Sequence, residues 1–326
     1  MSTQTGGLLS WRVTITICAA AAIVTLLGQE FAPSGGVAAV AGFSAGFLGS
    51  VFSTPRSTAR TLVLVAGCVL VCTLFPFPWI GFLCGFVLIS WAAIEGHTNG
   101  GFATIPALNG LLLYLLIAPD ERTAFLALMC VVTAVVGGLL SVRLKLAGAA
   151  NRPPMSLKGA LSVWVFLLAG LALTSFLAHL IGNQKSYWLS FLFVFRVLAP
   201  LQKVPDAAAR FGVGVALGSF IAIGLEFSGL PHKFLVVLGL AAAVFGVHRI
   251  GGNTIWTAMF FTIATLLITA PTIESAVFRI EAAAIVIAIV GCLAFLISWC
   301  WERIENRADN NRNSAANEGS DRYHRW

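Results

Sequence analysis

The chain has 326 residues, of which 58% are hydrophobic and only 10% are charged, with a formal net charge of +7. A soluble domain carries about 25% charged residues, so a chain this apolar could not cover its own surface with polar side chains. The composition excludes an ordinary soluble enzyme or binding domain and predicts a protein dissolved in a lipid bilayer. Basic charge in such a protein is typical of loops that face anionic lipid, and we expect no nucleic-acid partner.

Long apolar stretches recur along the chain, and a spanning helix needs about 20 mostly apolar residues. A bilayer leaves backbone groups no outside partner, so only helices or a closed barrel can cross it. The stretches lack the two-residue alternation of barrel strands, which favours helices. Breaks at Gly, Pro and charged residues predict an all-α polytopic membrane protein with about 12 transmembrane helices, at residues 11–29, 34–52, 58–75, 78–95, 102–118, 123–144, 158–181, 187–202, 208–226, 233–248, 253–270 and 279–301. The first is predicted to be a retained span and not a signal peptide, because no small-x-small cleavage pattern follows it.

The connection between the sixth and seventh spans is basic and contains a Pro pair, and the same residues recur on either side of it at nearly constant spacing. The pairs are Pro55 with Pro205, Arg60 with Arg210, His97, Gly100 and Gly101 with His248, Gly251 and Gly252, and Ala118 and Pro119 with Ala270 and Pro271. The pattern predicts two parallel six-helix repeats, at residues 1–150 and 151–302. The polar tail at 303–326 is predicted to be a frayed helix end followed by disorder.

Lys and Arg are unevenly divided between the predicted loops, and cytoplasmic loops of membrane proteins are rich in both. One set of loops holds Arg12, Arg56, Arg60, Arg143, Lys145, Arg152, Lys158, Lys203, Arg210 and Arg249. The other set holds only Arg122, Lys185, Lys233 and Arg279. The bias predicts a multi-pass membrane protein with both termini in the cytoplasm.

Arg196 lies inside the predicted eighth span, where a charge costs at least about 2.5–3.5 kcal/mol on insertion scales. Pro200 removes a backbone donor and clashes with the carbonyl of Arg196, so the helix is predicted to kink there. A guanidinium beside an opened backbone can hold both oxygens of a carboxylate, and Phe191 and Phe195 add aromatic surface. The alternative is that Arg196 extends to the cytoplasmic interface without binding anything.

His97 and His248 each end a predicted span and precede a Gly pair. Histidine titrates near neutral pH and could couple transport to protons, with Glu95 as a partner of His97. The alternative is a pair of interfacial histidines solvated by headgroups. Two isolated histidines do not make a metal site, and we expect neither metal nor cofactor.

The remaining conspicuous residues have a structural interpretation. Arg60 and Arg210 open spans on the cytoplasmic side and are expected to anchor them there. Gly214 and Gly218 form a small-xxx-small face for close helix packing. The seven cysteines all lie in apolar spans, where they are expected to pack as small residues. No nucleophile elbow, phosphate loop, zinc signature or Rossmann glycine pattern occurs, so an enzyme is not expected.

The segment from Tyr187 and Trp188 through a span ending near Pro200, a short turn, Arg210 and a Gly-rich helix resembles the fusaric-acid-resistance and aromatic-acid-exporter family. The six-plus-six organisation fits the same family. Larger members carry a soluble domain between the halves, so this chain is similar to a compact, membrane-only member. The resemblance implies an inner-membrane efflux pump for aromatic or other organic acids and a periplasmic membrane-fusion adaptor as partner.

These observations favour a proton-coupled secondary transporter that exports small, chiefly aromatic, carboxylic acids. Its substrate contacts would be Arg196, Phe191, Phe195, Tyr187 and Trp188, and its proton-carrying groups His97, His248 and Glu95. Two alternatives remain open: a non-transporting scaffold subunit of an efflux complex, and a membrane-embedded enzyme acting on lipid-linked substrates. A second copy of the chain is a further candidate partner.

Overall fold

The computed structural model describes residues 9–75, 77–100, 103–149, 153–181, 189–190, 193–194, 204–250, 253–269 and 273–323. Within these residues the chain forms α-helices and no strand, so the predicted all-α class is confirmed. The helices are α1 (Trp11–Phe31), α2 (Gly35–Val51), α3 (Pro55–Leu74), α4 (Pro78–Asn99), α5 (Thr104–Tyr114), α6 (Ala124–Arg143), α7 (Leu157–Ile181), α9 (Val204–Phe227), α10 (His232–His248), α11 (Thr254–Thr269) and α12 (Ile273–Tyr323).

The helix boundaries follow local signals in the sequence. Side-chain oxygens of Ser10, Thr54 and Thr123 accept hydrogen bonds from backbone N–H groups in the first turns of α1, α3 and α6. Such caps satisfy donors that have no partner inside the helix. Proline stands at the start of α3 and α4, where its missing N–H costs nothing. α4 ends at Asn99 and is capped by Gly100, whose φ of 67° is left-handed and favours glycine.

Seven of the helices, α1, α3, α4, α6, α7, α9 and α12, are long and apolar enough to cross a membrane. Their outward side chains are large and hydrophobic, with Val63 75% and Phe295 69% exposed. Lipid is the solvent that accepts such a surface, and the chain is a multi-pass membrane protein. Four shorter apolar helices, α2, α5, α10 and α11, pack among the long ones.

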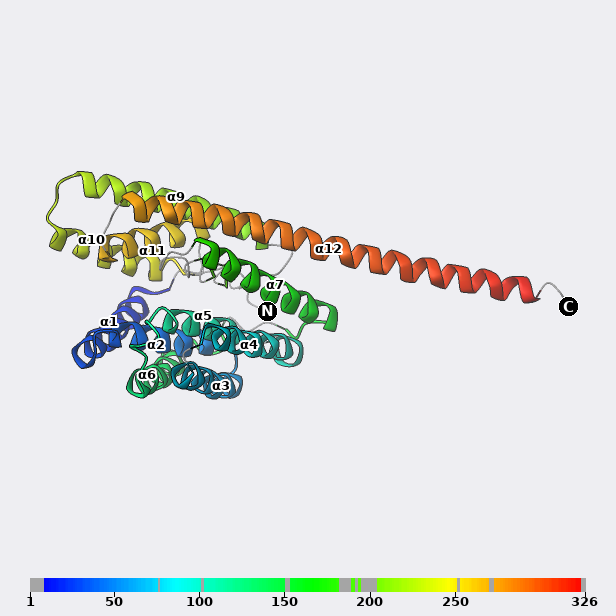
Figure 1. Cartoon of the computed structure of the whole chain (residues 1–326), viewed down its shortest axis with the longest axis horizontal. Coiled ribbons are helices and arrows are strands. Elements are labelled where there is room, and N and C mark those ends of the chain that lie inside the picture. The colour runs from blue at the N-terminus through cyan, green and yellow to red at the C-terminus, as the bar shows by residue number, and fades with distance from the viewer. Residues whose placement is uncertain are drawn as a thin grey trace.

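The helices gather into two groups, as Figure 1 shows. Helices α1–α6 lie together, and α9–α12 form the second group. α7 lies between them and packs against both α4 and α12, while α1 contacts α10. The largest apolar cluster joins α3, α4 and α5 to α7 and α12 and includes Leu108, Phe166 and Val290.

The first six helices run alternately between two faces of the molecule. On one, the backbone N–H of Gly148 donates to the carbonyl of Ser50 at 2.8 Å, and that of Met155 donates to the carbonyl of Gly96 at 2.9 Å. These bonds bring the ends of α2 and α4 against the connection from α6 to α7, and we call this side the linker face. On the opposite face, Ser34 after α1 donates a hydrogen bond to the carboxylate of Glu121 before α6.

α5 differs from the spanning helix that was predicted at residues 102–118. It has 11 residues, or about 16 Å at 1.5 Å per residue, whereas the hydrocarbon core is about 30 Å thick. Every residue of α5 except Leu113 is buried, and its neighbours are α2, α3 and α4. Non-helical backbone at membrane depth is tolerated where protein encloses it, so a short helix can occupy the centre of this bundle.

Glycines allow two helix pairs to approach closely. A Cβ atom on Gly46 of α2 would lie 2.6 Å from the carbonyl carbon of Ala134 in α6. In the second group, a Cβ on Gly214 of α9 would lie 2.7 Å from the Cβ of Ala258, and one on Gly218 would lie 2.6 Å from the carbonyl oxygen of Met259. Without Cβ atoms the backbones come into direct contact, the usual device for packing helices in lipid.

α12 is 51 residues long and continues as a helix beyond the bundle to Tyr323 (Figure 1). Here the structure differs from the sequence prediction, which placed fraying and disorder after residue 302. The segment mixes Ala, Glu and Arg, which are good helix formers, with five Asn and a Gly, which are poor ones, so propensity alone does not account for the helix. Because the spanning part already supplies a helical nucleus, each further residue only has to extend the helix.

Candidate functional site

The predicted substrate contacts lie outside the described residues: Arg196, Phe191, Phe195, Tyr187 and Trp188, together with Pro200 at the predicted kink. The described neighbours pack against α7. The Ser190 hydroxyl lies 3.1 Å from that of Thr174, and the ring of Phe193 stacks on Phe166 with centroids 5.3 Å apart. Phe193 is fully buried in this contact, so it belongs to the apolar core next to the predicted substrate residues.

A buried carboxylate lies near the linker face of the first six helices. Glu95, one turn before the end of α4, is only 1% exposed. The hydroxyl of Ser53 donates to its Oε1 at 2.9 Å, and that of Ser57 donates to the same oxygen. Thr104 donates to Oε2 from its hydroxyl at 2.7 Å and from its backbone N–H at 3.3 Å. Glu95 therefore ties α4 to the starts of α3 and α5.

The local sequence explains why these donors converge on one carboxylate. Thr54 caps α3 by accepting the Ser57 backbone N–H at 3.4 Å, so Ser57 lies in the first turn of the helix. α5 has Ala103 at its cap position and no capping side chain of its own. Glu95 replaces that cap by accepting the N–H of Thr104. The partial positive charge of a helix N-terminus favours a carboxylate at this position.

The C-terminal end of α5 contacts a positive charge, whereas its N-terminal end contacts the carboxylate of Glu95. Arg122 donates from Nε to the carbonyl of Ile117 and from Nη2 to the carbonyl of Leu115, both at 2.9 Å. These carbonyls follow the last turn of α5, where backbone acceptors have no partner within the helix. A cation at a helix C-terminus and an anion at its N-terminus both stabilise the helix dipole. The sequence prediction treated Arg122 as an outer-loop charge and missed this contact.

The hydroxyl groups can serve both protonation states of Glu95. An ionised carboxylate only accepts hydrogen bonds, whereas a protonated carboxyl group also donates one. A Ser or Thr hydroxyl both donates and accepts, so rotation about one bond changes its role. Ser53, Ser57 and Thr104 can therefore stay hydrogen-bonded to either form of the carboxyl group, with weaker bonds to the neutral form. The bond from the Thr104 N–H also caps α5, so Glu95 has a structural role in this cluster.

His97 does not pair with Glu95, and that predicted partnership is replaced by two separate contacts. Residues two apart on a helix point in different directions. Glu95 is buried among hydroxyls, while His97 is exposed and its Nδ1 lies 2.9 Å from the carbonyl of Met155. His97 therefore fastens the end of α4 to the connection that precedes α7.

His248 has a different environment from His97, although both end a helix. Its ring stacks on Trp11 at the start of α1, with centroids 3.9 Å apart and an angle of 14° between the planes. The Nδ1 atom is buried and has no hydrogen-bond partner. The stack connects the first and second helix groups at α1 and α10, so His248 lies at a junction between the two halves.

Arg60 and Arg210 lie in comparable places, each in the second turn of its helix, α3 and α9. Both side chains are exposed. Arg60 lies in the half of α3 that is nearer to the linker face, a few residues after Ser53 and Ser57 in the sequence. Within the described ranges, no group of three or more His, Cys, Asp or Glu side chains has an arrangement that could hold a metal ion.

Three residues of the carboxylate cluster, Ser53, Ser57 and Thr104, were absent from the sequence prediction. A signal for two of them exists in the hydroxyl-rich run from Ser53 to Thr58, but such a run at a helix start predicts a cap. Glu95 follows Ser53 and Ser57 by 42 and 38 residues. Only the packing of α3 against α4 shows that the run and the carboxylate meet.

No family model, curated protein or solved structure matches this chain closely enough to infer relatedness. The chemistry of the site therefore rests on the geometry of its own residues.

Proposed function

We propose that this chain is a proton-coupled secondary transporter that exports aromatic or other small organic acids across the inner membrane. The observation that carries the proposal is the burial of Glu95 among three hydroxyl side chains inside a multi-pass helical protein. Ionisable groups within spanning helices are costly, and they are typical of proton relays and ion pathways. The sequence contains no phosphate-binding loop, so ATP hydrolysis has no support as the energy source.

Glu95 is the proton carrier in this proposal. When ionised, it accepts charge-assisted hydrogen bonds from Ser57 and Thr104, which are roughly twice as strong as neutral ones. Protonation weakens these bonds and with them the attachment of α4 to the starts of α3 and α5. The protonation state thereby biases the packing of three helices, which is the link that coupled transport requires. His97 and His248 are further candidates for carrying protons near the linker face.

The substrate site of the proposal is the predicted eighth span. Arg196 would hold the carboxylate of the acid with its two-pronged guanidinium. Phe191 and Phe195, with Tyr187 and Trp188, would contact the aromatic ring. An organic acid that crosses a bilayer sheds water, so its charge needs a partner within the protein.

The proposal includes the topology and the family. Twelve spans in two parallel repeats would place the basic linker face, with Arg56, Arg143 and Lys145 near it, in the cytoplasm together with both termini. Membership of the fusaric-acid-resistance family would add a periplasmic adaptor as partner. The third, fifth and sixth predicted spans of each repeat correspond to α3, α5 and α6 in the first and to α9, α11 and α12 in the second. In both repeats the third packs on the other two, which supports the proposed repeat.

The test is transport by purified protein in liposomes. A pH difference is imposed, and the flux of radiolabelled fusaric acid is measured together with internal pH, with protein-free liposomes as background. Glu95→Gln keeps the size of the side chain and one acceptor oxygen but cannot ionise, so we expect it to fold and to lose at least tenfold in pH-driven flux. Glu95→Asp should retain part of the flux because it can still ionise.

The matched control is Glu121→Gln, which removes an exposed carboxylate on the opposite face. It should leave the flux unchanged. A Glu95→Gln protein with the pH-driven flux of the unmodified chain would remove Glu95 from the coupling mechanism. Flux no greater than that of protein-free liposomes in the unmodified chain would instead favour the scaffold role.

A further inference from the structure

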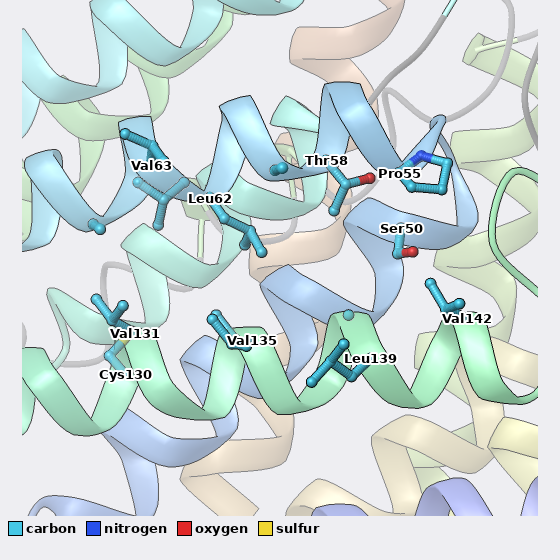
Figure 2. Close-up of a pocket in the computed structure, with 15 residues that line it drawn as sticks. Ser50, Pro55, Thr58, Leu62, Val63, Cys130, Val131, Val135, Leu139 and Val142 are labelled. Atoms are coloured by element: carbon cyan, nitrogen blue, oxygen red, sulfur yellow. The ribbon is translucent and has the colours of Figure 1, made fainter.

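A groove runs between α3 and α6 on the outer surface of the first helix group. Figure 2 shows Pro55, Thr58, Leu62 and Val63 of α3 on one wall and residues of α6 on the other. The α6 wall consists of Cys130, Val131, Ala134, Val135, Gly138, Leu139 and Val142. The groove has a volume of about 400 Å³ and almost only apolar lining.

The groove is open to the lipid side and shaped by small residues. Val63 is 75% exposed and Leu139 is 65% exposed, so its rims face the bilayer. Ala59, Ala66, Ala134 and Gly138 line it without filling it. A bulkier side chain at any of these positions would narrow or close the groove.

The length of the groove matches one leaflet of a bilayer. The lining on α3 extends from Pro55 to Ala66, about 17 Å at 1.5 Å per residue. Half of a hydrocarbon core that is about 30 Å thick is about 15 Å. The groove begins at the linker face, where α3 starts and α6 ends. One extended acyl chain from that leaflet therefore fits along it.

Three arginines lie near the linker-face end of the groove. Arg56 directly follows the lining residue Pro55 at the start of α3, and Arg60 is one turn further along the same helix. Arg143 directly follows the lining residue Val142 at the end of α6. All three arginines are exposed. Basic side chains beside a membrane surface attract anionic headgroups.

We propose that the groove between α3 and α6 binds one acyl chain of an anionic phospholipid, with its headgroup on Arg56, Arg60 and Arg143. The apolar walls bind the acyl chain. The three guanidinium groups select headgroups whose phosphate charge is not balanced by a cation in the same headgroup. Other lipids contact convex helix surfaces, which have neither an apolar groove nor a group of arginines beside it. The site is independent of Glu95 and of organic-acid transport.

The test uses the full chain in liposomes of phosphatidylcholine that contain a trace of photoactivatable lipid, with a diazirine on the acyl chain. One arm uses phosphatidylglycerol and the other phosphatidylcholine as the labelled lipid, and mass spectrometry locates the labelled residues. We expect phosphatidylglycerol to label the groove residues of α3 and α6 at least about fivefold more than phosphatidylcholine, since one basic side chain contributes about that factor.

Two variants separate the parts of the site. Gly138→Phe places a ring in the groove, and its Cβ has room because the nearest atoms are 3.8 and 3.9 Å away. It should abolish groove labelling by phosphatidylglycerol. The matched control Gly67→Phe adds the same ring on α3 where nothing lies within 4 Å, and labelling should persist. Replacing Arg56, Arg60 and Arg143 together by Gln should equalise the two lipids.

Equal labelling by both lipids in the unmodified chain would overturn the proposal, because it would indicate only ordinary contact lipid. So would groove labelling that survives Gly138→Phe in folded protein. If Gly138→Phe fails to fold, the triple Gln variant decides: undiminished preference for phosphatidylglycerol rules out the arginine site. Photocrosslinks in the groove to a second copy of the chain, without lipid adducts, would replace the lipid by a dimer interface.

Discussion

Replacing Arg122 by methionine removes the cation at the C-terminal end of α5 while keeping an unbranched side chain. The change breaks two hydrogen bonds of 2.9 Å to the carbonyls of Leu115 and Ile117. Hydrogen bonds to charged groups contribute about 1.5–3 kcal/mol each. Arg122 is only half-buried, so water can replace part of the loss. The lower end of the range applies, and we expect a loss of about 3 kcal/mol in the free energy of unfolding.

The assay is thermal unfolding in detergent with a thiol-reactive fluorophore, which reports exposure of the buried Cys68, Cys72, Cys84 and Cys130. For a domain of 150–250 residues 1 kcal/mol shifts Tm by about 2–4 °C, so a loss of about 3 kcal/mol predicts a decrease of roughly 6–12 °C for Arg122→Met. Arg143→Met is the matched control, because it removes an exposed arginine at the end of α6. Equal decreases in the two variants would refute the idea that Arg122 caps α5.

Three further predictions concern the proposed transporter. Arg196→Ala should reduce acid export by roughly tenfold to a hundredfold, and Arg196→Lys by less. The measurement is the resistance of cells to aromatic acids. Full resistance in cells with a folded Arg196→Ala protein would exclude Arg196 from the substrate site. Replacing both His97 and His248 by Gln should flatten the pH dependence of export in liposomes, and an unchanged profile would leave them with a structural role. Reporter fusions at the C-terminal tail and after Pro119 should locate these points on opposite sides of the membrane; one side for both would contradict the span count.

Residue type alone could predict only part of the candidate site. Glu95 could be selected from the sequence because a carboxyl group near the end of an apolar span is unusual. Its partners could not, since His97 is closer in sequence than Ser53, Ser57 or Thr104. The rotation of α4 decides which neighbours Glu95 meets, and that rotation depends on packing against α3 and α5.

The short helix α5 was also beyond the sequence prediction. Its apolar composition matches that of a span, and the Ala118 and Pro119 break predicted an end several residues later than Tyr114. After Tyr114, Arg122 donates to the carbonyls of Leu115 and Ile117, seven and five residues before it. Apolar composition carries no signal for a side chain that folds back onto preceding carbonyls.

The sequence by itself determined that this chain is inserted in a lipid bilayer, that it is helical there, and where most of the helices begin and end. Those properties follow from composition, from Pro and Gly positions and from capping residues, all of which act locally. Only the tertiary structure decided which sides of the helices face protein and which face lipid. The physical reason is that lipid tails and the protein interior are equally apolar, so hydrophobic periodicity, which separates inside from outside in a soluble protein, cannot tell Leu108 in the core from Val63 on the surface.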